Sequence, residues 1–198
     1  MFRIACHSTD LTGRITCRPI RFTRLHLRQR SPSRCSNSCS RLLALFLIWL
    51  PQFQISPKLV TAFAAVFQQV HSSSLTEQEI QIVLLTDAVA NSCAYAIAFH
   101  TALALKQRVS SGETEAIRTR LVPKDQRFAA LSTLAKTLIE KRGHLSEQEL
   151  DAFIAVGFTK EQILEVIAVV AASTITNYAG TIANPPLENQ FQQFAWRG

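Results

Sequence analysis

The thiol of Cys93 and the imidazole of His100 are the two side chains whose types and spacing best fit joint chemistry. Seven residues correspond to two turns of an α-helix, so both side chains would lie on one face of a helix. A rise of about 1.5 Å per residue separates them by roughly 10 Å along the axis, too far for a direct hydrogen bond. Ala96 occupies the position between them, and its methyl group can do no acid–base or redox chemistry. A thiol at that position would stand within one turn of both groups.

Two predicted helices within residues 78–106, meeting near residues 91–92, must position this pair. The first helix begins at a capping box, in which Thr76 and Glu79 satisfy backbone N–H groups of the first turn. Residues 80–85 are then almost all apolar, which is typical of a helix buried at the centre of a domain rather than on its surface. The second helix carries the thiol and the imidazole.

Two further polar side chains belong to this stretch. Asp87 lies inside the apolar run, and we expect it on the solvated edge of its helix rather than paired in the interior, because unpaired buried acids are rare. Tyr95 belongs to the second helix, which is predicted for residues 92–108, and does not lie on the face that Cys93 and His100 would share. We therefore expect Tyr95 to serve packing.

The rest of residues 56–198 also follows a helical pattern. No segment alternates between apolar and polar residues over the length of a strand, so the domain should be all-α. The last long helix is apolar on nearly all sides and must be covered, either at the domain centre or in a subunit interface. We expect the aromatic tail after it to pack on the domain or on a neighbouring subunit. Outside the central pair, the predicted helices are residues 57–71, 110–120, 123–142, 146–155 and 160–183, and the tail aromatics are Phe191, Phe194 and Trp196.

The positive charge of the chain belongs to its N-terminal part. The net charge is +7, but residues 1–55 hold nine arginines against the single acid Asp10, while residues 56–198 are near neutral. The domain has no basic stripe interleaved with aromatic residues and no recognisable nucleic-acid-binding module. The sequence therefore predicts no nucleic-acid partner.

Residues 1–55 are predicted to be a basic extension outside the folded domain, which would be residues 56–198. Residues 1–41 are rich in Arg and Ser, which favours disorder and also resembles an organelle transit peptide. The apolar run of residues 42–50 is shorter than the roughly 20 residues of a membrane span. We rank a start site placed too far upstream first and a transit peptide second. The expected location is accordingly the cytoplasm, with an organelle as the alternative.

The five cysteines do not form a disulfide framework, because four of them lie in the predicted extension and Cys93 is the only one in the domain. No set of Cys and His residues has the spacing of zinc ligands, so the sequence predicts neither a metal nor a cofactor. A single cysteine on an apolar helix can be a small buried hydrophobic residue or a reactive thiol. Both interpretations of Cys93 stay open at this point.

The central stretch resembles the alkylhydroperoxidase D-like group of the carboxymuconolactone decarboxylase family. The family motif is Cys-x-x-Cys-x-x-x-His on a helix, with a proton-relay glutamate twelve residues before the first cysteine. Cys93 and His100 match the first cysteine and the histidine, while Ala96 stands in place of the second cysteine and Gln81 in place of the glutamate. The resemblance continues through Gly-Phe-Thr-x-Glu-Gln-Ile-Leu-Glu-Val, Thr-Asn-Tyr and Pro-Pro-Leu, and it covers residues 57–190.

This resemblance implies a bundle of six to seven helices that assembles into trimers or hexamers. It implies thiol-dependent hydroperoxide reduction, weakened or lost because of Ala96 and Gln81, with Cys93, His100 and Gln81 as the candidate catalytic residues. The alternative is a non-catalytic oligomer that binds a small apolar ligand or serves as a scaffold. The decarboxylase branch of the family would need cationic groups for a substrate carboxylate, and the motif helix has none before Lys106.

Overall fold

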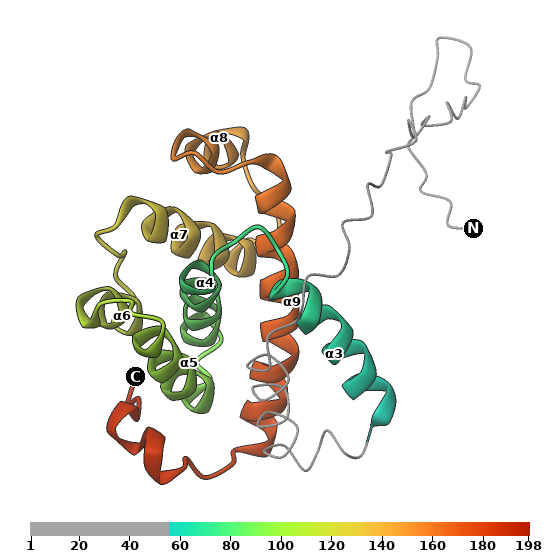
Figure 1. Ribbon diagram of the computed structural model, residues 1–198, viewed down its shortest axis with the longest axis vertical. Coiled ribbons are helices and arrows are strands. Elements are labelled where there is room, and N and C mark those ends of the chain that lie inside the picture. The colour runs from blue at the N-terminus through green and yellow to red at the C-terminus, as the bar shows by residue number, and fades with distance from the viewer. Residues whose placement is uncertain (1–55) are drawn as a thin grey trace. The chain divides into compact units, whose positions relative to one another are not determined.

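The structure is a computed structural model that describes residues 56–198, and these residues form seven α-helices and one short 3-10 helix (Figure 1). No strand occurs within this range, so the predicted all-α fold is confirmed. Residues 1–55, predicted to be a basic extension, lie outside the described residues, and the domain boundary and location stay predictions. The helices are α3 (Pro57–Val70), α4 (Glu77–Ala90), α5 (Ala94–Lys106), α6 (Ser111–Arg118), α7 (Gln126–Glu140), α8 (Glu147–Ala155), α9 (Lys160–Ala183) and η1 (Asn189–Phe194).

Helix α4 is the central helix, as its apolar sequence predicted. Every residue from Glu79 to Val89 is buried, so α4 has no solvated face. It packs against α5, α6, α7 and α9, which surround it in Figure 1. A helix whose sides are all covered needs apolar residues all round, which explains the unbroken run in its sequence.

Side-chain caps set the start of every α-helix in residues 56–198 except α5. The predicted capping box at Thr76 is present, and capping boxes also begin α8 at Ser146 and α9 at Thr159. The predicted start of the helix at Pro123 is wrong, because α7 begins three residues later. Asp125 is the N-cap there, and its carboxylate accepts hydrogen bonds from the N–H groups of the second and third helical residues.

The junction between α4 and α5 fixes the position of the candidate thiol. Ser92 has a φ of 53°, in the left-handed region that ends a helix. The N–H of Ser92 donates to the carbonyl of Val89, and the N–H of Cys93 donates to the carbonyl of Ala88 at 3.0 Å. These two bonds are those of a Schellman motif. The two helices thus meet where the sequence predicted, but α5 begins at Ala94 instead of residue 92.

Helix α9 packs against α3, α4, α5 and α7, yet it leaves part of its apolar surface exposed in the single chain. By length and composition it is the one helix of residues 56–198 that could cross a membrane, as the core helices of many globular proteins also could. The prediction that this helix must be covered on all sides is therefore met only in part within one chain. Its exposed apolar side chains are Leu164, Ile167, Tyr178 and Ile182.

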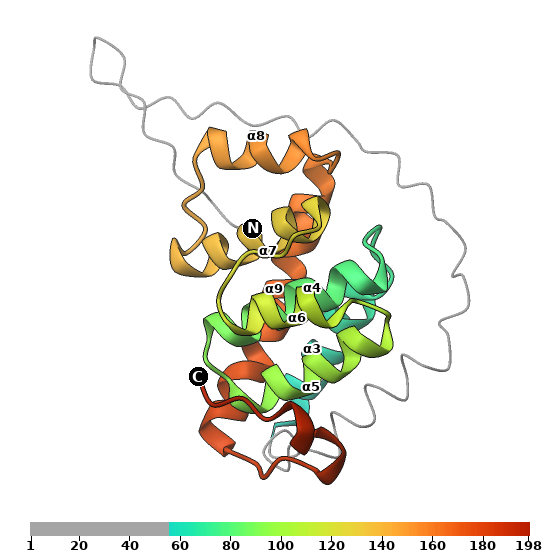
Figure 2. The same ribbon diagram turned by 90° about the vertical axis from the view of Figure 1, so that its left-hand side faces the viewer.

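The C-terminal segment folds back along α5, where Figure 2 shows it in red. The ring of Phe191 lies 5.3 Å from that of Phe99, edge to face. The indole N–H of Trp196 donates to the carbonyl of Arg118 at 3.1 Å. The prediction that the tail aromatics pack on the domain is confirmed for these two residues.

Candidate functional site

Gln81 and His100 form a buried pair between α4 and α5. The amide oxygen of Gln81 lies 3.1 Å from Nδ1 of His100, and both side chains are buried. Because an amide oxygen can only accept, Nδ1 carries the proton of the neutral imidazole. Burial, with a smaller effect from the charge of His71, lowers the pKa of His100 from 6.5 to about 3. The imidazole is therefore neutral at physiological pH.

The other side of His100 faces a very small cavity between α3, α4, α5 and α9. Its volume is about 10 Å³, room for no more than one water molecule. This cavity is lined by Phe63, Phe67, Val70, Leu84, His100, Ala172, Ser173 and Thr176.

The sequence predicted that Cys93 lies inside the helix. In the structure it is instead the N-cap of α5 and has an extended backbone. Its carbonyl accepts the first hydrogen bond of α5, from the N–H of Ile97. Its own N–H donates to the carbonyl of Ala88 at the end of α4. The residue is thus held from both sides. The N-terminal end of a helix favours negative charge, which suits a thiol that reacts as its thiolate.

A pocket of about 300 Å³ opens beside Cys93, and His100 does not line it. Cys93 itself is only 2% exposed, so a small edge of the thiol reaches this space. Gly180 of α9 allows this packing, since a Cβ there would lie 3.3 Å from Sγ. The lining residues are Ser92, Cys93, Ala94, Tyr95, Gly180, Thr181, Asn184, Pro185, Leu187, Ala195 and Trp196.

The structure therefore divides the three predicted catalytic residues into two places. Gln81 and His100 are joined, while no hydrogen bond within residues 56–198 connects Cys93 to either of them. Ala96 is buried between the two places and offers no group for proton or electron transfer. The chemical link between Cys93 and the Gln81–His100 pair is therefore missing within residues 56–198.

Asp87 corrects the sequence-based prediction, because it is fully buried rather than on a solvated edge. Its Oδ1 accepts from the amide of Asn91 at 2.9 Å, and its Oδ2 accepts from the amide of Asn177 at 2.8 Å. Burial raises the pKa of Asp87 to about 7, although hydrogen bonds from Ser173, Asn91 and others oppose this rise. The partner amide on α9 makes the burial tolerable, and it lies 90 residues away in the sequence.

The carboxyl group of Asp87 is close in the sequence to the thiol of Cys93. Asp87 is the residue before Ala88, whose carbonyl holds the N–H of Cys93. On α9, Asn177 stands one turn before Gly180, which packs on the thiol. The only sequence signal for this arrangement was a single acid inside an apolar run, and its partner could not be identified from spacing.

Tyr95 is the second correction, because it does more than pack. Its hydroxyl donates to a carboxylate oxygen of Glu188 at 3.1 Å, and its ring lines the pocket of Cys93. Burial, together with the charge of Glu188, raises the pKa of Tyr95. The tyrosine is therefore a neutral hydrogen-bond donor that ties α5 to the C-terminal segment.

The C-terminal segment forms one wall of this pocket through Leu187, Ala195 and Trp196. The guanidinium of Arg118 anchors the segment, since it donates to the carbonyl of Phe194 at 3.0 Å and to that of Ala195 at 3.3 Å. Access to Cys93 thus depends on residues near the end of the chain. Within residues 56–198 no group of three His, Cys, Asp or Glu side chains is placed to hold a metal ion.

Comparison with known proteins agrees with this fold. Residues 57–137 match the Carboxymuconolactone decarboxylase family, while no curated protein sequence matches the chain. The alkylhydroperoxidase AhpD core of an uncharacterized peroxidase-related protein from Ralstonia eutropha JMP134 is similar, with a TM-score of 0.63 and 19% identity. The match covers 69% of this chain and 74% of that chain.

Two further solved structures have the same fold. Protein ATU0492 from Agrobacterium tumefaciens has a TM-score of 0.63 and 19% identity, covering 71% of this chain and 99% of that chain. The debrominase Bmp8, in the complex of a Cys-to-Ala variant with 2,3,4-tribromopyrrole, has a TM-score of 0.65 and 15% identity. The match covers 80% of this chain and 88% of that chain. At these identities the likeness concerns the fold. Residues 57–137 thus match the carboxymuconolactone decarboxylase family, and the described residues have the alkylhydroperoxidase D-like fold.

Proposed function

We propose that this protein is a one-thiol hydroperoxide reductase in which Cys93 is the reactive group. The observation that carries this proposal is the pocket of about 300 Å³ beside Cys93, which would admit a small organic hydroperoxide to the thiol. The position of Cys93 at the N-terminus of α5 supports the proposal, because negative charge is favoured there.

The chemistry needs one thiolate and two external thiols. The Cys93 thiolate attacks the terminal oxygen of the hydroperoxide, the O–O bond breaks, and the leaving alkoxide takes a proton to become an alcohol. The sulfur loses two electrons and becomes a sulfenic acid. An external thiol then attacks the sulfenic sulfur, which forms a mixed disulfide and releases water. A second external thiol attacks the external sulfur of that disulfide, which releases a small-molecule disulfide and restores the Cys93 thiol.

An external thiol is required because Ala96 stands in place of the second cysteine of the family motif, the one that attacks the peroxide there, and Cys93 has no partner thiol within residues 56–198. Proton transfer is also weakened, since Gln81 cannot take a proton and His100 is neutral, with its pKa lowered to about 3. We therefore expect slow turnover, limited by activation of the thiol and by resolution of the sulfenic acid.

The test is to expose the full chain to cumene hydroperoxide in the presence of dimedone, which traps sulfenic acids. We expect a dimedone adduct on the peptide that contains Cys93, and dithiothreitol-dependent peroxide consumption that the Cys93→Ser variant lacks. The cysteines of residues 1–55 serve as internal references in the same digest. Peroxide consumption that is equal in the parent and in Cys93→Ser would refute the proposal.

A second candidate function is ligand binding without turnover. It is favoured by the loss of both the second thiol, at Ala96, and the acid, at Gln81, while the pocket is kept. The neighbour Bmp8 was solved with the small halogenated ring 2,3,4-tribromopyrrole, which suggests a small apolar ring as a test ligand. Saturable binding of such a ring that protects Cys93 from alkylation, without peroxide consumption, would favour this function.

For either function we propose a homo-oligomer, a trimer or a hexamer, formed through α3 and α9. These helices expose large apolar side chains in the single chain, and exposed apolar patches of this kind mark interfaces. Light scattering should give a multiple of the chain mass, and Ile182→Asp should reduce it. The residues that support this interface are Leu59, Val66, Leu164, Ile167, Tyr178 and Ile182.

A further inference from the structure

The pocket of Cys93 has no ionic side chain in its lining, within the part of the chain that the structure describes. Its volume of about 300 Å³ is enough for a small organic molecule. Leu187 and Trp196 supply apolar surface, while Thr181 and Asn184 supply neutral polar groups. The pocket therefore offers a ligand apolar contact and uncharged hydrogen-bonding groups, but no ion partner.

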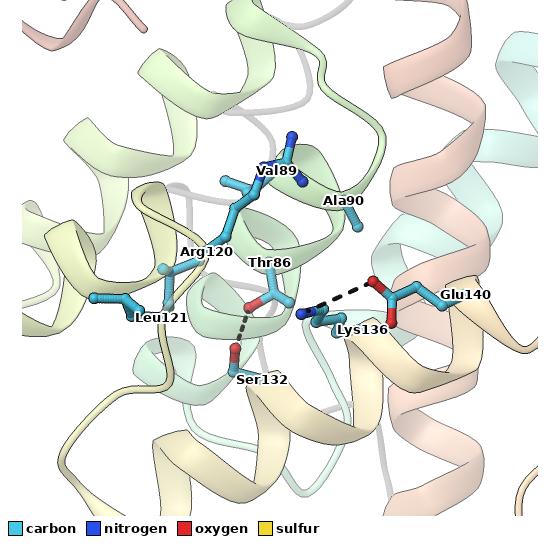
Figure 3. A pocket seen from close by; sticks show the side chains of 9 residues that line it. Thr86, Val89, Ala90, Arg120, Leu121, Ser132, Lys136 and Glu140 are labelled. Atoms are coloured by element: carbon cyan, nitrogen blue, oxygen red, sulfur yellow. Dashed lines mark hydrogen bonds and ion pairs between the residues drawn. The ribbon is translucent and has the colours of Figure 1, made fainter. Parts of the chain in front are cut away.

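The cleft between α4, α7 and the segment after α6 has the opposite character (Figure 3). Three ionic side chains line it, those of Arg120, Lys136 and Glu140. Its volume is only about 30 Å³, room for a water molecule or two and not for an organic ligand. Charge in a lining is thus present elsewhere on this domain, and its absence beside Cys93 is specific to that pocket.

A charged cavity of about 390 Å³ adjoins the pocket of Cys93. Its lining includes one acid, Glu115, and the three arginines Arg118, Arg120 and Arg197. Trp196 is the residue that lines both cavities. The guanidinium carbon of Arg120 lies over the indole, 5.7 Å from the ring centre. The indole of Trp196 therefore separates the uncharged pocket from the arginines.

Two opposite charges lie behind the lining of the pocket without entering it. The hydroxyl of Tyr95 donates to the carboxylate of Glu188 at 3.1 Å, and the guanidinium of Arg120 donates to the hydroxyl of Ser92 at 3.1 Å. Both charges are thus already bound to residues that line the pocket. A ligand carboxylate that entered would lose part of its hydration and would gain no ion pair in return.

We infer that the pocket of Cys93 selects uncharged organic hydroperoxides over those that carry a carboxylate, and that Trp196 determines this specificity. The apolar body of the substrate lies against Leu187 and Trp196, and its neutral hydroperoxide group meets the thiol. Trp196 acts by keeping the arginines of the neighbouring cavity out of the pocket. The inference rests on the proposed function for the reaction of the thiol, and it adds the class of substrate.

The test compares two alkylating reagents of nearly the same size, neutral iodoacetamide and anionic iodoacetate, on the folded full chain. Both rates are measured by mass spectrometry on the peptide that contains Cys93. The ratio of the two rates is divided by the ratio for 2-mercaptoethanol, which removes the intrinsic difference between the reagents. We expect Cys93 to favour iodoacetamide about five-fold more than the free thiol does.

Two variants should reduce this preference, each by about two- to five-fold, the range expected for one exposed ion pair. Trp196→Ala opens the pocket toward Arg120, and Trp196→Phe, which keeps an aromatic ring, is its control. Wider access raises both rates, so their ratio isolates the effect of charge. Thr181→Lys adds a cation on the exposed last turn of α9, where positive charge is favoured, so this variant should fold. Thr181→Gln is the neutral control.

Peroxide consumption with cumene hydroperoxide and with its para-carboxylate tests the substrate class directly, and the parent should consume the neutral compound faster. If the parent consumes neither peroxide but Cys93 still prefers iodoacetamide, the proposed function fails while the selectivity of the pocket is supported.

The selectivity is overturned if Cys93 gives the same ratio as 2-mercaptoethanol, if neither reagent reaches it in the folded chain, or if Thr181→Lys leaves the ratio unchanged. An unchanged ratio in a folded Trp196→Ala variant would overturn the role of Trp196. Equal consumption of the two peroxides would overturn the substrate class and leave the peroxide chemistry of Cys93 in place.

Discussion

The amide oxygen of Gln81 lies 3.1 Å from Nδ1 of His100, although nineteen residues separate them in the chain. The family motif that this stretch resembles has a glutamate at the position of Gln81. An amide there stabilises one tautomer but can neither accept a proton nor hold a positive imidazole as a carboxylate would. The contact therefore fixes the tautomer of His100 and gives the imidazole no proton acceptor at Gln81.

Restoring the missing groups should restore the chemistry. Gln81→Glu places a carboxylate beside His100 and favours its protonated form, and Ala96→Cys adds a thiol one turn after Cys93. Ala96 is buried, so the added sulfur should cost roughly 1–3 kcal/mol of stability. We expect the double variant to form a disulfide with Cys93 and to reduce cumene hydroperoxide faster than the parent, measured with dithiothreitol as reductant.

The single variants are the controls for this experiment. Ala96→Cys alone should form the disulfide but turn over slowly, and Gln81→Glu alone should form none. A folded double variant without the disulfide would mean that Cys93 and position 96 do not face each other.

The pH dependence of stability should contain two opposing contributions. His100 has its pKa lowered from 6.5 to about 3, so the folded state lacks a proton that the unfolded chain binds, and its contribution rises with pH in this window. Asp87 has its pKa raised from 3.8 to about 7, so the folded state holds a proton that the unfolded chain loses, and its contribution falls with rising pH. Each contribution is on the order of 4 kcal/mol in total.

The two slopes should nearly cancel in the parent between about pH 4 and 6.5, and two variants should separate them. In Asp87→Asn the free energy of unfolding should rise with pH, because only the His100 contribution remains. In His100→Asn, which keeps a donor for Gln81, it should fall with pH. Urea unfolding at several pH values measures both slopes, and slopes of the same sign in the two variants would contradict the assignment.

Gly180 and Cys93 should be coupled in stability. Gly-to-Ala in the interior of a helix normally stabilises by about 0.5–1 kcal/mol. Here the new Cβ would lie 3.3 Å from the sulfur of Cys93, which should offset that gain. We expect Gly180→Ala to stabilise the Cys93→Ala background by about 1 kcal/mol more than it stabilises the parent.

Thermal or urea unfolding of the four proteins in this double-mutant cycle gives the coupling energy. The Cys93→Ala background supplies the control, since it keeps the same helix with the sulfur removed. Additive effects would show that the two helices separate enough to relieve the contact.

The C-terminal segment should control access to Cys93. Arg118→Gln removes the bonds to the carbonyls of Phe194 and Ala195, and we expect the pocket wall to open more often. Cys93 should then react several-fold faster with iodoacetamide, measured on its own peptide by mass spectrometry. Arg197→Gln is the matched control, because this exposed arginine makes no hydrogen bond to the segment among residues 56–198. Equal rates in the parent and in Arg118→Gln would show that the thiol is reached by another path.

The sequence by itself determined the features that depend on near neighbours in the chain. The capping boxes at Thr76, Ser146 and Thr159 are local hydrogen bonds between residues three apart. The unbroken apolar run of α4 by itself indicates a buried helix. The candidate pair Cys93 and His100 also followed from spacing within one stretch, while Gln81 came from the resemblance to the family motif. Helix ends were less certain, because a single residue such as Ser92 or Asp125 can move them.

Only the tertiary structure decided which environment each of these side chains occupies. Asp87 was expected in solvent, yet Asn177 of α9 pairs with it in the interior, and the pocket of Cys93 owes a wall to Trp196. His100 was expected to share a face with Cys93, yet the Schellman motif holds the thiol outside the helix. The physical reason is that burial, pKa and access are set by groups from segments remote in the chain, and a local pattern does not record their positions.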